Sequence, residues 1–306
     1  MKGILLFGGG GFVGGNIASV AKAEGWQVYV AGRTYRSGVE GADWRIVDIT
    51  EKDAVDRVIE EVKPDAVVNV AAIASIDRAE REQELAWQVN VEGAKHIAEI
   101  CAKRSIKYVF FSSDAVFDGK GSVYTEEDEL NPVNYYGYTK AEAERVILKA
   151  HPGAVTIRIS LVMGFPVTGG NSFFADLESK LKDGKTILCP IDEVRTPVDV
   201  ITLSECVLEL AENDFSGVLH VGSTDSINRY DLTKKLAKRM SFDEGLVVPL
   251  DSHESRSGRA PRHKNGIISV SKAQKALRTR LFGVDEGIDR AFKERFTLGD
   301  VIQLYG

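Results

Sequence analysis

The stretch Ile4-Leu5-Leu6-Phe7-Gly8-Gly9-Gly10-Gly11-Phe12-Val13-Gly14 joins a short apolar run to a cluster of glycines, and a helical pattern follows it. Glycine permits a tight turn between a strand and a helix. It also lets the backbone approach a pyrophosphate held by free N–H groups at the helix N-terminus. The strand before the glycines and the helix after them supply the context that such a motif requires. The stretch predicts a dinucleotide-binding loop, with a plain flexible turn as the alternative. The residues expected at the phosphates are Gly8, Gly11, Phe12, Val13 and Gly14.

Short apolar runs alternate with longer amphipathic segments through the first half of the chain. The sequence predicts strands at 3–7, 27–31, 66–70, 108–112 and 155–159, and helices at 13–24, 52–61, 83–104 and 136–149. This alternation is typical of an α/β Rossmann fold, a doubly wound parallel sheet with helices on both faces.

The regular alternation weakens after residue 164, which suggests a second unit. We expect residues 1–164 to form the dinucleotide-binding domain, with 198–222 returning to it. Residues 165–197 and 223–306 are expected to form a smaller, discontinuous substrate-binding lobe.

The composition is that of an ordinary globular protein and limits the classes of partner. The 306 residues are 43% hydrophobic and 27% charged, with a net charge of −6, so broad attraction to nucleic acid or to an anionic membrane is not expected. No stretch has the ~18 apolar residues of a membrane span. The three cysteines form no CxxC pair, which favours buried thiols and a cytoplasmic location. No carboxylate cluster demands a metal ion.

The end of the second predicted strand indicates which coenzyme is bound. Sites that prefer NAD carry an acidic residue there for the ribose hydroxyls. This chain instead has Ala31-Gly32-Arg33-Thr34, followed by Arg36. Two guanidinium groups are thus available for a 2′-phosphate, which predicts NADP (NADPH) over NAD. Exposed arginines on a loop, without a ligand, are the alternative.

A tyrosine and a lysine four residues apart enter the predicted helix 136–149. In Tyr136-Gly-Tyr-Thr-Lys140 this spacing places both side chains on one helical face. A phenol is a poor proton donor at neutral pH unless its pKa is lowered, and a neighbouring ammonium lowers it. Ser113 follows an apolar strand and is expected beside Tyr136, because ligands bind beyond the carboxyl ends of parallel strands.

Several motifs together resemble the extended short-chain dehydrogenase/reductase superfamily, and within it the dTDP-4-dehydrorhamnose reductase-like branch. They occur in the family's order over about three quarters of the chain. The matching segments are GGGGFVG (8–14), VDIT (47–50), NVAAIASIDRAE (69–80), QVNVEGA (88–94), VFFSSDAVFDG (109–119), NPVNYYGYTKAEAE (131–144), IRISLVMG (157–164), GGNSF (169–173), RTPV (195–198) and HVGSTDSINRY (220–230).

The resemblance implies roles for individual residues around the coenzyme. Tyr136 would be the general acid, Lys140 would lower its pKa and hold the nicotinamide ribose, and Ser113 would orient the substrate carbonyl. Asn90 would be a structural or relay residue. The remaining residues implied at the coenzyme are Asp48 and Ile49 against the adenine, and Ala71, Ala72 and Ile73 along the cleft.

The resemblance also implies a pocket for a nucleotide sugar, a small-molecule substrate. Ser160, Asn171 and Arg195 fall where the family shapes this pocket, and Asp114 follows the serine expected at the carbonyl. Arg262 belongs to a basic segment, 256–264, that either binds the diphosphate or is a solvated loop.

Departures from the family pattern leave the sugar open. Ala115, Leu161, Met163 and the pair Ala74-Ser75 replace aromatic or hydroxyl side chains that the family often has near its substrate. The implied activity is NADP-dependent reduction of a nucleotide-linked keto-deoxysugar. The alternatives are an epimerase or dehydratase, with Asp114 as an added acid–base residue, and a non-catalytic NADP-binding regulatory subunit. A homodimer is a further open expectation.

Overall fold

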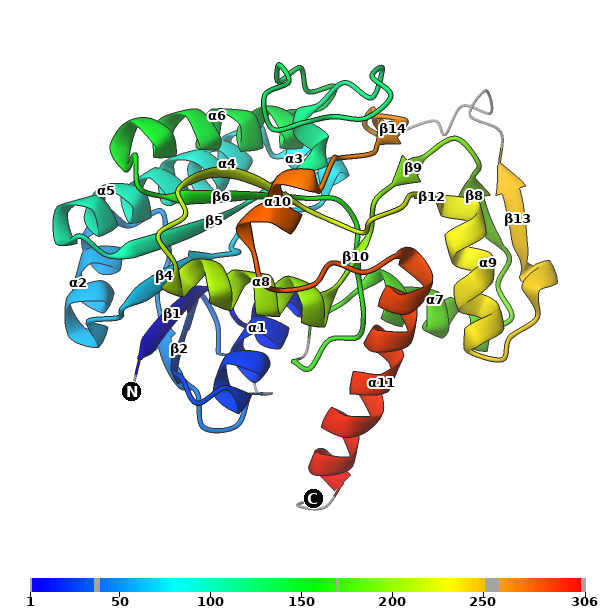
Figure 1. Cartoon of the computed structure of the whole chain (residues 1–306), viewed down its shortest axis with the longest axis horizontal. Coiled ribbons are helices and arrows are strands. Elements are labelled where there is room, and N and C mark those ends of the chain that lie inside the picture. Colours follow the sequence, from blue (N-terminus) through cyan, green and yellow to red (C-terminus); the bar gives the residue numbers. More distant parts are fainter. Residues whose placement is uncertain (1, 36–38, 169, 251–258, 304–306) are drawn as a thin grey trace.

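The computed structural model describes residues 2–35, 39–168, 170–250 and 259–303, with side chains as far as residue 293. Seven parallel strands form its central sheet: β1 (Gly3–Phe7), β2 (Gln27–Gly32), β3 (Asp43–Ile46), β4 (Ala66–Asn69), β5 (Lys107–Ser113), β6 (Val155–Ile159) and β11 (Gly217–Val221). Their order is β11-β6-β5-β4-β1-β2-β3 (Figure 1). The predicted doubly wound parallel sheet is confirmed.

Helices cover both faces of this sheet. The helices α1 (Phe12–Ala23) and α8 (Val200–Glu212) pack together on one face, and α2 (Lys52–Val62), α5 (Ala94–Arg104) and α6 (Tyr135–Ala150) pack on the other. The strand order runs outward in opposite directions from the neighbours β1 and β4. Connections leaving β1 and β4 therefore diverge and leave a crevice at the carboxyl ends of these strands, which is where open α/β sheets bind ligands.

The predicted elements of the first half are present, but one expected helix is divided, and a short helix, α3 (Ile76–Arg81), and an edge strand were not predicted. The expected helix over 83–104 is divided into α4 (Gln83–Trp87), the π-helical η1 (Gln88–Gly93) and α5. The edge strand β3 was not predicted. Its four residues include Asp43 and Arg45, so it lacks the apolar run that revealed the other strands.

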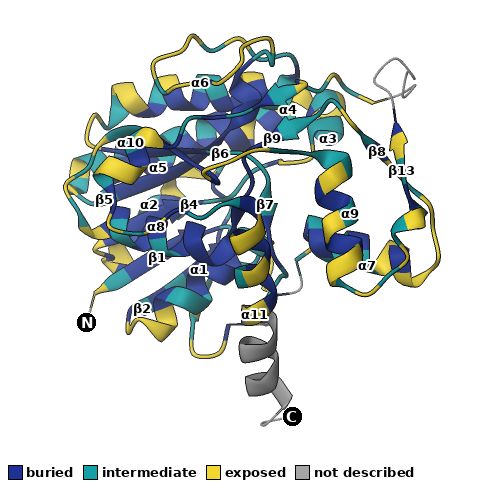
Figure 2. Cartoon of the chain, turned by 45° about the vertical axis from the view of Figure 1, so that its right-hand side comes forward, coloured by how far each residue is buried: buried dark blue, intermediate teal, exposed yellow. Residues whose placement is uncertain are grey.

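The smaller lobe has its own apolar core. It contains α7 (Phe173–Lys182), α9 (Arg229–Arg239), α11 (Val284–Gln303) and the parallel pair β8 (Ile187–Pro190) and β13 (Val247–Leu250). Buried side chains from these elements form one cluster that includes Phe174, Leu177, Leu236 and Phe292. Figure 2 shows buried residues along the central sheet, and both buried and exposed residues on α9.

The packing refines the expected division of the chain. The segment 270–281 was assigned to the lobe, but Val270, Ala273 and Leu281 pack into the core beside α8. This segment includes α10 (Ser271–Ala276), which contacts β11. Across the described part of the chain, no helix has both the length and the apolar character needed to span a membrane.

Candidate active site

A cleft of about 550 Å³ lies at the crevice between β1 and β4. This volume is in the range of small-molecule and cofactor sites. Most of the predicted coenzyme residues line it, whereas Arg36 lies outside the described residues. The predicted residues in the lining are Gly8, Gly11, Phe12, Val13, Gly14, Arg33, Asp48, Ile49, Ala71, Ala72 and Ile73.

The glycine loop fits a bound pyrophosphate. Gly8 has a φ of +83°, and a Cβ atom added to it would lie 2.6 Å from the Ala71 backbone nitrogen. A Cβ at Gly14 would lie 2.6 Å from the carbonyl oxygen of Gly8. Gly11 is the N-cap of α1, and among the described residues no side chain caps this end. The first N–H groups of the helix are therefore available to an anion.

The far part of the cleft suits a phosphorylated ribose. Arg33 lines it beyond β2, where no acidic residue stands among Ala31 to Thr34. Asp48 accepts hydrogen bonds from the backbone nitrogen of Thr50, at 3.0 Å, and from its hydroxyl, at 2.9 Å. Trp44 of β3 also lines the cleft.

Asn90 supports the cleft from behind rather than lining it. It is buried in η1, where its Oδ1 accepts a hydrogen bond from the Ile73 backbone nitrogen at 2.8 Å. Its Nδ2 donates to Thr139 Oγ1 at 2.9 Å. Asn90 thus links the segment after β4 to α6, the helix that carries Tyr136, which fits the structural role implied by the sequence.

Ser113, Tyr136 and Lys140 converge beside this cleft. Ser113 ends β5, the neighbour of β4, while Tyr136 and Lys140 lie one turn apart on α6. Asn134 fixes the start of this helix, because its side chain accepts a hydrogen bond from the Gly137 nitrogen at 2.9 Å. The Ser113 hydroxyl lies beside the phenol of Tyr136 and acts to lower its pKa.

The pKa of Tyr136 differs from the sequence prediction. Burial raises the pKa of Tyr136 to about 12, against the lowering effect of the Ser113 hydrogen bond. Burial also lowers the pKa of Lys140 to about 7. The amine of Lys140 donates to the Phe111 carbonyl at 2.8 Å. The expected lowering of the Tyr136 pKa by Lys140 is therefore wrong for this structure, because desolvation of the phenol has the larger effect.

Asp114 is the centre of a buried polar cluster next to Ser113. Its Oδ1 accepts a hydrogen bond from Ser113 Oγ at 3.1 Å, and its Oδ2 accepts one from Ser160 Oγ at 2.9 Å. His263 Nε2 and Arg195 Nε lie 3.1 and 3.3 Å from the same Oδ2. Burial alone would raise the pKa of Asp114, but His263, Arg195 and Ser160 together hold this pKa at about 2.

The predicted substrate residues divide into three groups. Ser113, Asp114, Ser160 and Arg195 meet in the cluster just described. Asn171 instead lines the coenzyme cleft. The third location is that of Arg262, whose guanidinium donates to Asp77 Oδ2 at 2.9 Å and to the Ala260 carbonyl.

His263 was missed as a site residue. The sequence showed it only as a member of a basic run, and nothing local to that run indicates that it meets a carboxylate 149 positions earlier.

A segment of the lobe crosses the glycine loop. Thr168 Oγ1 donates to the carbonyl oxygens of Gly10 and Gly11, at 3.1 and 3.3 Å. Asn16 in α1 donates to the Phe165 carbonyl at 3.1 Å. The coenzyme cleft and the lobe are thus joined directly, before any ligand binds.

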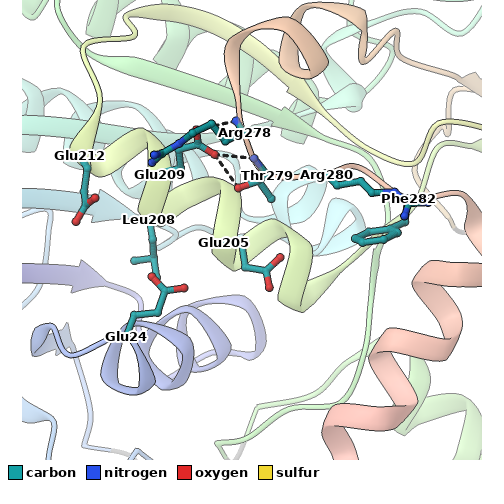
Figure 3. A pocket seen from close by; sticks show the side chains of 9 residues that line it. All are labelled: Glu24, Glu205, Leu208, Glu209, Glu212, Arg278, Thr279, Arg280 and Phe282. Atoms are coloured by element: carbon teal, nitrogen blue, oxygen red, sulfur yellow. Dashed lines mark hydrogen bonds and ion pairs between the residues drawn. The ribbon is translucent and has the colours of Figure 1, made fainter.

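A second hollow, of about 440 Å³, lies between Glu24, α8 and the segment 278–282 (Figure 3). Four glutamates line it, and one of them, Glu209, accepts hydrogen bonds from Thr279. Burial and the neighbouring Glu205 and Glu212 raise the pKa of Glu24. Arg278 and Arg280 also line this hollow, but the four glutamates outnumber them, which disfavours an anionic dinucleotide there.

Comparisons with known proteins agree with this geometry. A dTDP-4-dehydrorhamnose reductase from Aggregatibacter actinomycetemcomitans is 28% identical over 293 residues, covering 90% of this chain and 94% of the relative. Methionine adenosyltransferase 2 subunit beta from Danio rerio is 29% identical over 74% of this chain and 71% of that protein.

Among solved structures, dTDP-4-dehydrorhamnose reductase from Bacillus anthracis, in complex with NADP, superimposes with a TM-score of 0.84. It is 25% identical to this chain and covers 96% of it, with 99% of the other chain matched. The family model for the RmlD substrate binding domain matches residues 1–296. Because that match spans nearly the whole sequence, this chain belongs to the RmlD substrate binding domain family.

Proposed function

We propose that this protein is an NADPH-dependent reductase of a nucleotide-linked keto-deoxysugar. The observation that carries the proposal is the position of Ser113, Tyr136 and Lys140 on the strand and helix next to a dinucleotide cleft. The reductase relative from Aggregatibacter and the NADP-bound relative from Bacillus anthracis support the substrate class and the coenzyme.

The cleft with the glycine loop and Arg33 would hold NADPH, which would supply the hydride for the carbonyl carbon of the substrate. Tyr136 donates its phenolic proton to the carbonyl oxygen, so that the ketone becomes an alcohol, and Ser113 hydrogen-bonds the same oxygen. Lys140 lies one helical turn from Tyr136, and its ammonium form would stabilise the phenolate that remains. A proton from solvent then restores the phenol.

The two ends of the substrate would meet different surfaces. The carbonyl approaches Ser113 and Tyr136, next to the cluster that contains Asp114 and Arg195. Arg195 already pairs with Asp114 and donates to the carbonyls of His263 and Lys264, so it shapes the pocket more than it offers a free charge. The family's usual aromatic and hydroxyl side chains are absent at Ala115 and Leu161, so the proposal stops at the class of sugar.

The proposal is tested by mixing the protein with NADPH and each of a panel of nucleotide-linked keto sugars. Turnover is measured as the loss of absorbance of the reduced nicotinamide. Tyr136→Phe should lower kcat by at least about 100-fold, because it removes the general acid. It should change the Kd for NADPH by no more than about twofold, since the glycine loop is untouched. Tyr138→Phe is the matched control, because Tyr138 lies on the same helix and is exposed.

Other outcomes would support the alternatives. Tight NADPH binding without turnover of any ketone would contradict a reductase and favour a binding subunit. An isomerised sugar formed without net consumption of NADPH would contradict it in favour of an epimerase.

A further inference from the structure

His263 is a buried histidine beside the reacting groups that the proposed chemistry does not use. Its side chain is 4% exposed, and its Nε2 lies 3.1 Å from Asp114 Oδ2. Its Nδ1 is also buried and has no hydrogen-bond partner among the described residues. Burial removes water from both ring nitrogens, and within the described part of the chain only Nε2 gains a hydrogen-bond partner in exchange. The contact with Asp114 is therefore the polar interaction that offsets the cost of burying the imidazole.

The surrounding backbone leaves room for this contact. A Cβ atom at Gly266 would collide with Asp114 Oδ2 and lie 2.8 Å from His263 Nε2. Gly119 has a φ of +75°, and its Cβ would lie 2.8 Å from the Cβ of His263. Any larger residue at these two positions would therefore displace the histidine from the carboxylate.

The loop that carries His263 is fastened to the helix that carries the phenol. Asn134, the N-cap of α6, donates from its Nδ2 to the Pro261 carbonyl at 3.0 Å. On the other side of the loop, Asp77 accepts from the backbone nitrogen of Ala260 at 2.9 Å and pairs with Arg262. Hydrogen bonds thus connect the loop that carries His263 to the helix that carries Tyr136.

A row of polar contacts runs from the phenol to the imidazole. Ser113 lies beside the phenol of Tyr136, whose pKa it lowers, and it donates to Asp114 Oδ1 at 3.1 Å. An ionised carboxylate only accepts hydrogen bonds, so in this structure the Ser113 hydrogen points to Asp114 Oδ1, and the Ser113 oxygen accepts from the Ala115 nitrogen at 3.2 Å. To bond the carbonyl oxygen of a ketone, the hydroxyl must turn this hydrogen from Oδ1 to the substrate. Because His263, Ser160 and Arg195 all engage Oδ2, the carboxylate keeps Oδ1 turned toward Ser113.

We propose that His263 is a positioning residue for the reduction. By donating to Asp114 Oδ2 beside Ser160 and Arg195, it restricts the rotation of the carboxylate and thereby the position of the Ser113 hydroxyl opposite Tyr136. This inference rests on the proposed reductase function. It assigns no proton transfer to the histidine itself, which is not among the residues that line the coenzyme cleft.

The test compares two substitutions in the full-length protein, with NADPH and a keto sugar that the wild type reduces. His263→Phe keeps an aromatic ring but removes one of the three groups at Asp114 Oδ2, so Ser160 and Arg195 alone hold the carboxylate and its rotation relative to Ser113 is less restricted. We expect kcat to fall by about 10- to 100-fold, the cost of a small misplacement at the reacting atoms. His263→Gln retains an N–H that can reach Oδ2, and it should recover most of that loss.

Two further measurements separate positioning from general damage. The Kd for NADPH should be unchanged in both variants, because the coenzyme cleft does not include the loop 259–266. His151→Phe is a matched control, since His151 follows the opposite end of α6 and contacts the Ile106 carbonyl. It should leave kcat unchanged.

Each outcome counts for or against the inference. An active wild type with an unaffected His263→Phe overturns the positioning role and leaves the reductase standing. Equal losses in the Phe and Gln variants, or losses that follow Tm and NADPH affinity, also overturn it, because they indicate a purely structural role. A wild type that binds NADPH but reduces no keto sugar refutes the reductase and the inference with it.

Discussion

The carboxyl edge of the sheet carries two sites of opposite construction. At β1 and β4 the cleft is lined largely by glycines, small side chains and the uncapped N-terminus of α1. At β5 and β6 the cluster around Asp114 consists of charged and polar side chains that already bond one another. The first site leaves hydrogen-bonding capacity for a ligand, whereas the second uses most of its capacity internally.

The two sites therefore depend on different interactions to keep their geometry. A phosphate site built from backbone N–H groups needs space and a correct turn, so substitutions that add side-chain atoms are expected to disturb it most. A cluster of buried charges needs each partner, because removing one leaves another without compensation in a region of low dielectric. The three predictions below separate the steric from the electrostatic site.

The largest expected effect is a steric one at the glycine loop. In Gly14→Ala, the added Cβ would lie 2.6 Å from the Gly8 oxygen and 2.7 Å from the Gly9 Cα, so the loop must shift. Losing two charge-assisted hydrogen bonds to the phosphates would lower NADPH affinity by at least about 100-fold. Fluorescence titration measures this. Gly3→Ala, at the other end of β1 with contacts no closer than 3.7 Å, should bind normally.

The next effect is electrostatic and depends on pH. The folded pKa of Asp114 is about 2, below its ordinary value, so the ionised form contributes stability that is present above about pH 4. That contribution is lost as pH falls through about 2. Asp114→Asn should therefore cost about 2 kcal/mol in unfolding free energy at pH 7, and less at pH 3.

Urea unfolding of the wild type and the variant at both pH values measures this difference. Asp43→Asn, an exposed position at the start of β3, should show no comparable cost. A difference between wild type and Asp114→Asn that does not shrink at low pH would show that the cluster does not depend on the charge of Asp114.

The smallest effect concerns the rim of the cleft, where both kinds of interaction meet. Arg33→Ala should weaken NADPH binding about tenfold and leave NADH binding unchanged, because a solvent-exposed charge pair with a 2′-phosphate is modest in strength. Arg57→Ala, an exposed arginine on α2 outside the cleft lining, is the control. An equal loss for both coenzymes would assign Arg33 to the pyrophosphate or to the loop itself.

The steric site was also the more predictable from sequence. A strand, four glycines and a helix are neighbours along the chain, and their local pattern determines the turn that they form. The alternation of apolar runs likewise predicted the parallel sheet, and only the short polar strand β3 escaped it.

The electrostatic site was only partly predictable. Ser113, Asp114 and Ser160 follow strand ends, which the sequence locates, but Arg195 and His263 reach them through the short strands β9 (Val194–Arg195) and β14 (Asn265–Gly266). Pairing between such distant short segments leaves no periodic signal. Asn171, expected in the substrate pocket, lines the coenzyme cleft, because the lobe segment that precedes it crosses the glycine loop.

After the first lobe segment the chain returns to the central sheet through α8 and β11. This return restricts where the protein can be cut into separate fragments. A fragment that ended at residue 164 would lack β11, so one edge of the sheet would present unpaired backbone groups beside β6. It would also lack α8, exposing apolar side chains of α1 such as Ile17 to water. The nucleotide-binding half therefore cannot be excised as a simple N-terminal piece. A separable version would need a rewired gene that splices α8 and β11 directly onto the first six strands.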